Sequence, residues 1–179
     1  MDMSTGKKPH PTVAELFGLE RIEGWHRPED PPSLYCFRPA GLLPMEQILA
    51  VDAISGVTQV WTASSEKILV AETRLDLVET RLFTALVLSY PSSVARYQMR
   101  ALCEMRDIVV VKEELERALQ EQRGDAFMQP VEDLIAACNG KIRPLGMRIH
   151  RESGYVLTSD QQEPEQVIAQ GDSHHARID

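Results

Sequence analysis

Apolar positions follow their most regular spacing near the C-terminal end, in residues 129–141. Pro130 suits a first helical position, and Asn139-Gly140 is a typical helix stop. Between them, apolar residues recur at spacings of three, four and seven: Val131, Leu134, Ile135 and Cys138. The pattern predicts an amphipathic helix whose outward positions are Gln129, Glu132, Asp133, Ala136, Ala137 and Asn139.

From residue 57 onward the pattern before this helix is typical of strands. Short runs rich in branched and aromatic residues are separated by small polar breaks. They predict a compact antiparallel sheet from residues 57–63, 67–71, 74–77, 81–84 and 86–88. A further short strand is predicted at 108–111, and a hairpin at 147–150 and 155–157 around the four-residue turn 151–154.

Two more helices are predicted between the sheet and residue 129. Pro91-Ser92-Ser93 ends the strands and caps a helix with an apolar stripe of Val94, Tyr97, Met99, Leu102 and Met105. Residues 112–119 form the second helix, followed by a loop at 120–127. Before residue 57 we expect a capping-box helix at 12–19, a proline-rich segment at 27–33, a strand at 34–37 and a helix at 44–51.

In this order, sheet, helix, strand, helix, loop, helix and hairpin describe a winged helix. We therefore predict an α+β fold: a winged helix-turn-helix with an N-terminal antiparallel sheet and a C-terminal β-hairpin wing. The expected domains are an N-terminal extension at 1–56, the winged-helix domain at 57–158, and an acidic tail at 159–179 that we expect to be disordered.

Composition narrows the class of protein. The chain has 179 residues, of which 43% are hydrophobic, and carries a net charge of −8, about half of it in the tail. No run approaches the roughly 20 apolar residues that span a bilayer, and the polar start lacks a signal-peptide core, so we expect a cytoplasmic protein without membrane contact. The negative charge opposes approach to phosphate, so any contact with DNA needs a local basic patch.

Few residues indicate catalysis or metal binding. No glycine-rich phosphate loop, Ser-His-Asp arrangement or HExxH spacing occurs, so we predict no enzyme activity, cofactor or metal. The three cysteines are widely spaced among apolar neighbours and are predicted to be buried thiols. Trp61 is expected in the core or an interface, Gly154 as a turn residue with positive φ, and residues 155–157 as closing the core.

Residues 67–158 resemble the OmpR-type winged-helix output domain of bacterial response regulators. The similar segments are LDLVETRLF at 75–83, RYQMRALCEMRDIVVVKEEL at 96–115, PVEDLIAACNGKI at 130–142 and MRIHRESGYVL at 147–157. The resemblance implies a DNA-binding transcription regulator in which the helix at 130–142 enters the major groove and the hairpin is the wing.

Two departures from that family change the expected function. The residues before the similar region show no pattern of a phosphoryl-accepting receiver domain, so we expect no control through a built-in receiver. The family's third helix usually carries several arginines and a lysine. At those positions this chain has Gln129, Leu134, Ala136, Ala137, Asn139 and Gly140.

Two hypotheses about function remain open. In the first, the chain binds DNA, with groove-facing residues Gln129, Asp133, Ala137, Asn139 and Lys141 and a cationic group at the wing formed by Arg143, Arg148, His150 and Arg151. Those wing cations could equally be solvated side chains. The strand at 57–63 and the N-terminal helices could pair two copies into a homodimer, which would strengthen binding, or could pack on the same domain. In the second, the winged helix binds a transcription factor, RNA polymerase or another assembly, with little or no DNA binding.

Overall fold

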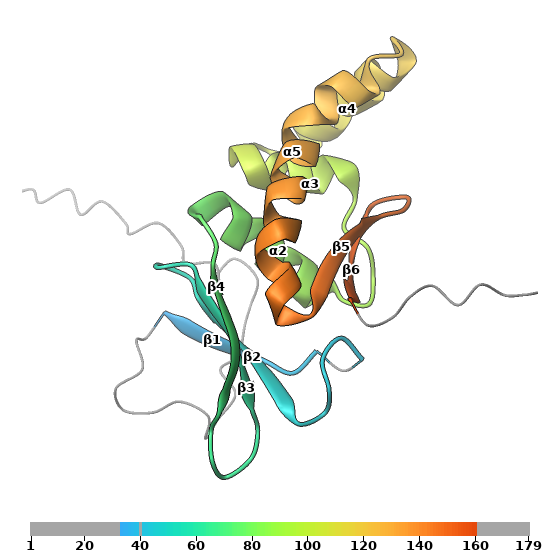
Figure 1. Cartoon of the computed structure of the whole chain (residues 1–179). Helices are drawn as coiled ribbons and strands as arrows, with labels where there is room; N and C mark the ends of the chain where they lie inside the picture. The colour runs from blue at the N-terminus through green and yellow to red at the C-terminus, as the bar shows by residue number, and fades with distance from the viewer. Residues whose placement is uncertain (1–32, 40, 161–179) are drawn as a thin grey trace, which may run out of the picture.

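The computed structural model describes residues 33–39 and 41–160. They form an α+β fold with a four-stranded antiparallel sheet, four helices and a C-terminal hairpin, as the sequence predicts in outline (Figure 1). The sheet comprises β1 (Leu34–Phe37), β2 (Gln47–Asp52), β3 (Val57–Thr62) and β4 (Leu69–Arg74). No helix among the described residues is long and apolar enough to cross a membrane. The predicted helix at 12–19, the segment 27–32 and residues 161–179 lie outside the described residues.

The sheet has the order β1-β2-β3-β4, with every strand antiparallel to its neighbours. The strands predicted at 34–37, 57–63 and 67–71 are confirmed, but the helix predicted at 44–51 is wrong, because these residues contain β2. Four successive β2 residues, Ile48 to Val51, are at most 2% exposed. Burial on both faces of a strand produces a continuous apolar run, which periodicity alone does not distinguish from a helix.

Two further expectations about the sheet change. Because β1 and β2 pair with β3, residues 34–56 belong to the same sheet as the rest of the domain, and the boundary expected at residue 56 falls within the β2–β3 connection. Strand β3 is hydrogen-bonded along both edges, to β2 and to β4. It therefore has no open edge for the predicted pairing of two copies through 57–63.

The strands predicted at 74–77, 81–84 and 86–88 are wrong beyond Arg74, since most of this stretch forms helix α2 (Leu77–Ser89). A capping box starts the helix: the Asp76 carboxylate accepts from the Glu79 N–H at 2.8 Å, and the Glu79 carboxylate accepts from the Asp76 N–H at 2.8 Å. Residues Leu82 to Val87 are all buried. Burial around the whole helix removes the polar face that would have marked it in the sequence.

Helix α3 (Arg96–Glu104) confirms the helix expected after residues 91–93, although its N-cap is Ala95, whose N–H donates to Gln98 Oε1 at 3.0 Å. The strand predicted at 108–111 is wrong. These residues are the first turn of α4 (Ile108–Gln120), which Asp107 caps through the Val109 N–H at 2.8 Å. Their branched side chains suggested a strand, but the side-chain cap satisfies the N–H groups of a helix start.

The helix predicted at 129–141 is part of the longer α5 (Gly124–Ile142). Pro130 lies inside this helix rather than at its start, and Asn139-Gly140 does not end it. The loop expected at 120–127 is correspondingly reduced to residues 121–123 between α4 and α5. The core face of α5 is formed by Met128, Val131, Ile135, Cys138 and Ile142, all at most 6% exposed.

After α5, a short 3-10 turn (Arg143–Leu145) leads into the hairpin of β5 (Met147–Arg151) and β6 (Tyr155–Ser159), which confirms the predicted hairpin. Tyr155, Val156 and Leu157 are buried, as predicted. Tyr155 also exchanges backbone hydrogen bonds with Val94, at 2.7 and 2.8 Å. The hairpin therefore packs against the segment before α3 as well as beside α5 (Figure 1).

Burial of the cysteines follows the prediction in part. Cys36 and Cys138 are 3% and 0% exposed, whereas Cys103 is half-buried. Burial raises the pKa of Cys138 to about 12 and that of Cys103 to about 11. Both of these thiols therefore stay protonated at neutral pH.

Gly154 is needed for a different reason from the predicted one. Its φ angle is outside the left-handed region, which among the described glycines is occupied by Gly41, Gly56 and Gly146. A Cβ atom at residue 154 would instead lie 2.3 Å from the carbonyl oxygen of Val94. The glycine thus permits close approach of the hairpin to the segment before α3.

We expect Gly154→Ala to lower the free energy of unfolding by about 2–4 kcal/mol, because the clash with the Val94 backbone forces the hairpin away. Gly140→Ala is the matched control, since a Cβ there meets nothing within 4 Å and alanine favours a helix by about 1 kcal/mol. Urea unfolding of both variants tests this. Equal stability of the two variants would contradict the close-approach explanation.

Candidate functional site

The exposed side of α5 lies opposite its core face and carries small or polar side chains. Gln129 donates from Nε2 to the Asp133 carboxylate at 2.8 Å, so this amide and this acid satisfy each other one turn apart. The other exposed residues on this side are alanine, proline and glycine, which extend little beyond the helix backbone. We call this surface the α5 outer face and define it by Ala126, Gln129, Pro130, Asp133, Ala136, Ala137 and Gly140, which are all exposed.

Asn139, predicted to face the groove, is held by the hairpin instead. Its Nδ2 donates to the Ile149 carbonyl at 3.1 Å, and its Oδ1 accepts from the Ile149 N–H at 2.7 Å. The side chain thus supplies both partners that a neighbouring strand would supply to β5. Asn139 could contact a DNA base only if both of its hydrogen bonds to Ile149 were broken.

Glu132 provides a second attachment of the hairpin to α5. Its Oε1 accepts from the Tyr155 hydroxyl at 2.6 Å and lies 3.1 Å from Arg151 Nη1. Burial, together with the bond to Glu132, raises the pKa of Tyr155 to about 12, so the hydroxyl remains a donor. Arg151, predicted as a wing cation, is therefore paired with an acid of α5, and its other terminal nitrogen lies 3.6 Å from Asp125.

Lys141, the only lysine of α5, points to the start of α2 rather than to the α5 outer face. Its Nζ lies 2.6 Å from Glu79 Oε2, in a carboxylate that is only 2% exposed and also caps α2. The hydrogen bond to Glu79 raises the pKa of Lys141 above its ordinary value. The lysine charge is used to balance a buried carboxylate.

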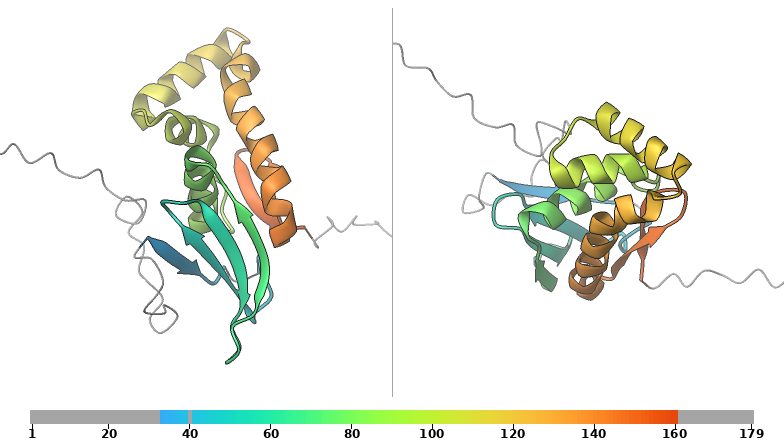
Figure 2. Two further views of the ribbon diagram at one scale, coloured as in Figure 1. Left: turned by 60° about the vertical axis from the view of Figure 1, so that its left-hand side comes forward. Right: turned by 90° about the horizontal axis from the view of Figure 1, so that it is seen from above.

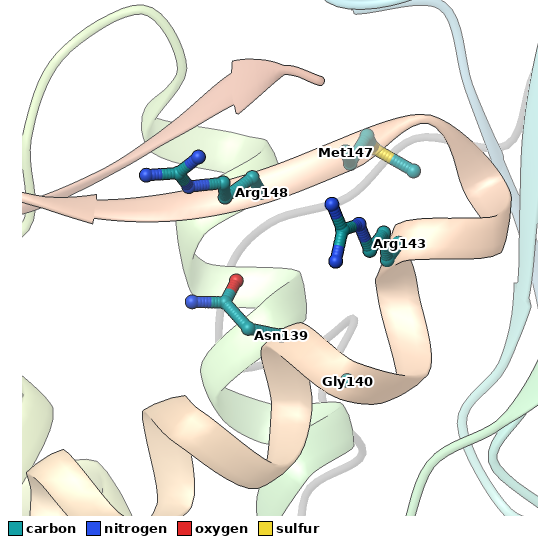
Figure 3. A pocket seen from close by; sticks show the side chains of 5 residues that line it. All are labelled: Asn139, Gly140, Arg143, Met147 and Arg148. Atoms are coloured by element: carbon teal, nitrogen blue, oxygen red, sulfur yellow. The ribbon is translucent and has the colours of Figure 1, made fainter.

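Two predicted cations remain near the end of α5. Arg148 is exposed on β5 and forms no ion pair with any residue in the described part of the chain, and Arg143 is 77% exposed with a loose 3.6 Å contact to Asp160. Together with Asn139, Gly140 and Met147 they line a pocket of about 240 Å³ (Figure 3). His150 lies half-buried on the same strand, opposite Val156.

This arrangement has limited chemical capacity. Two guanidinium groups beside this pocket can hold one or two phosphate or carboxylate groups. Within residues 33–39 and 41–160, no group of three His, Cys, Asp or Glu side chains could hold a metal ion. The predicted site residues therefore divide into an exposed and nearly neutral helix face, a set engaged in internal contacts, and two exposed arginines.

Prediction from the sequence missed the roles of Glu79, Glu132 and Tyr155. The spacing of Asp76 and Glu79 is that of a capping box, so the start of α2 had a local signal. Glu132 was predicted on the outward side of α5, but it is partly buried against the hairpin, and nothing nearby in the sequence indicates that it binds Tyr155, 23 residues later. These three residues determine which cations stay exposed.

No family model, curated protein or solved structure matches the chain.

We expect Lys141→Met to lower the free energy of unfolding at pH 7 by about 1–3 kcal/mol, because the buried Glu79 carboxylate loses its cation. The lysine pKa is raised by folding, so its contribution is complete below the pKa of an unfolded lysine, about 10.4, and is lost as the pH rises through the folded value. The difference between wild type and variant should therefore shrink above pH 10.

Urea unfolding between pH 7 and pH 11 measures this difference, and titration of other groups cancels in the comparison. Arg143→Met is the control, since its exposed side chain should change stability by no more than about 0.5 kcal/mol. A Lys141→Met difference as small as the control would show that the pair with Glu79 has no structural role, and a difference that stays constant to pH 11 would show that the lysine charge is not its cause.

Proposed function

We propose that the chain is a transcription regulator built on a winged helix, in which the α5 outer face binds another protein and contact with DNA is limited to phosphate groups. The winged-helix assignment is supported by the order of the sheet, the helices and the final hairpin, and by the resemblance of residues 67–158 to OmpR-type domains. The chain has four described helices where that resemblance implies three, because residues 77–89 form α2.

The internal engagement of the predicted DNA-contacting residues carries this proposal. Asn139 is bonded to Ile149, Lys141 to Glu79 and Arg151 to Glu132. A helix that reads bases needs amide or guanidinium groups directed into the groove, and its affinity grows with the number of phosphates neutralised. Here those groups maintain the fold, and the α5 outer face keeps the negative charge of Asp133.

The same face suits a protein helix. Alanine, proline and glycine project little beyond the backbone of α5, so a second helix can approach closely, within the usual 8–10 Å between helix axes. A partner helix with bulky apolar side chains would fill the space above Ala136, Ala137 and Gly140, and a basic residue on it would pair with Asp133. We therefore expect a partner with an amphipathic, weakly basic helix, and the resemblance favours a component of the transcription machinery.

Direct DNA binding remains a second candidate because of one observation. Arg143 and Arg148 are exposed beside the pocket at the end of α5, where two phosphate groups could be held. Two such contacts give weak binding without base preference. A sequence-specific regulator would need further contacts from a second copy or from a partner.

A photo-crosslinking residue at position 136 tests the protein contact in cells that naturally make this chain. We expect an adduct with one transcription-machinery protein, and binding of that purified protein weakened at least tenfold by Ala137→Arg. The same residue at Glu113, which is exposed on α4, is the control and should give no such adduct. Adducts from position 136 to DNA alone, or a partner unaffected by Ala137→Arg, would refute the proposal.

A further inference from the structure

The four-stranded sheet has two apolar faces, and the described elements cover only one of them. Leu49, Val51 and Val60 point toward the helices and join the main core. The alternate residues Cys36, Ile48 and Ala50 form a separate cluster, packed by Leu34, Trp61 and Ala63. We call this second surface the outer sheet face. The described helices and the hairpin lie on the other side of the sheet (Figure 2).

The outer sheet face is nevertheless buried within a single chain. Cys36, Ile48 and Ala50 are 3%, 0% and 1% exposed. Neighbours in the same sheet shield the edges of a side chain but leave its tip open, so complete burial of an isoleucine requires a second layer above it. The β3–β4 turn does not supply that layer, because residues 64–68 are exposed.

We infer that the N-terminal segment, residues 1–32, packs on the outer sheet face. This segment joins β1 at Ser33, whose hydroxyl donates to the Asp52 carboxylate at 2.7 Å, so the chain enters the sheet at the strand that carries Cys36. It contains a predicted helix at 12–19 with Val13, Leu16, Phe17 and Leu19. An eight-residue helix is about 12 Å long, which spans the roughly 10 Å across three strands.

The C-terminal residues are a poorer occupant of this face. They follow Asp160 at the end of the hairpin, which packs against α2 and α5. Residues 161–179 also contain few large apolar side chains, namely Val167, Ile168 and Ile178. A second copy of the chain is unnecessary, since the burial of Ile48 is reached within one chain.

The Cys36 thiol offers a direct reporter of this packing. In the full chain at pH 8, the rate of Cys36 alkylation by iodoacetamide is followed by mass spectrometry of its peptide. We expect Leu16→Asp with Phe17→Asp to raise this rate at least tenfold. Cys138, which is 0% exposed, serves as the internal measure of global unfolding and should not change. Glu15→Gln with Glu20→Gln is the matched control and should leave both rates unchanged.

An unchanged Cys36 rate in the aspartate variant would overturn the inference. Protection of Cys36 that disappears when the wild-type protein is diluted would also overturn it, because a second copy would then be the cover. If Cys36 and Cys138 both become reactive, a photo-crosslinking residue at Phe17 decides. Crosslinks to residues 34–63 support the packing, and crosslinks only to other regions contradict it.

Discussion

The attachment of the β5–β6 hairpin to α5 determines which side chains of α5 and of the hairpin remain available to bind a partner. Asn139 pairs with both backbone groups of Ile149, and Glu132 accepts from Tyr155 while pairing with Arg151. Asn139 and Glu132 lie seven positions apart, or about 10 Å along the helix, so the hairpin is fixed at two levels. Such a constraint leaves the hairpin little freedom to move relative to α5.

This attachment has an electrostatic consequence. Glu132 neutralises Arg151 and Glu79 neutralises Lys141, so two of the cations nearest to α5 serve the fold. What remains outward is a helix face of small side chains with the negative charge of Asp133 and, at its end, Arg143 and Arg148. A surface of this kind supports the proposed contact with a protein more than it supports the reading of DNA.

The parts of the fold predicted from sequence are those with local causes. The hairpin follows from its turn, and α5 follows from its 3.6-residue period, which also placed Gln129, Asp133 and Ala137 correctly on the exposed side. Strand β2 and helix α2 were mispredicted because both are buried nearly all round. Their apolar runs reflect the layers that enclose them, and those layers are formed by distant residues.

In the candidate site too, features with local causes could be predicted from the sequence, and features that depend on distant residues could not. Exposure of α5 residues depends on position within one helix, so the sequence predicts it. The partners of Asn139, Arg151 and Lys141 lie 10, 19 and 62 residues away, at Ile149, Glu132 and Glu79. No local pattern connects those pairs, and only the folded arrangement shows that they remove charge from the predicted DNA-binding surface.

The most direct test of this account is the salt dependence of binding to a non-specific DNA duplex, measured by fluorescence anisotropy. Binding that releases counterions has a slope of about −0.9 per phosphate contact in a plot of log K against log salt concentration. With Arg143 and Arg148 as the two exposed arginines at the end of α5 that contact phosphate, we predict a slope no steeper than about −2. A slope of about −4 or steeper would contradict the account, because cations other than Arg143 and Arg148 would then have to bind phosphate.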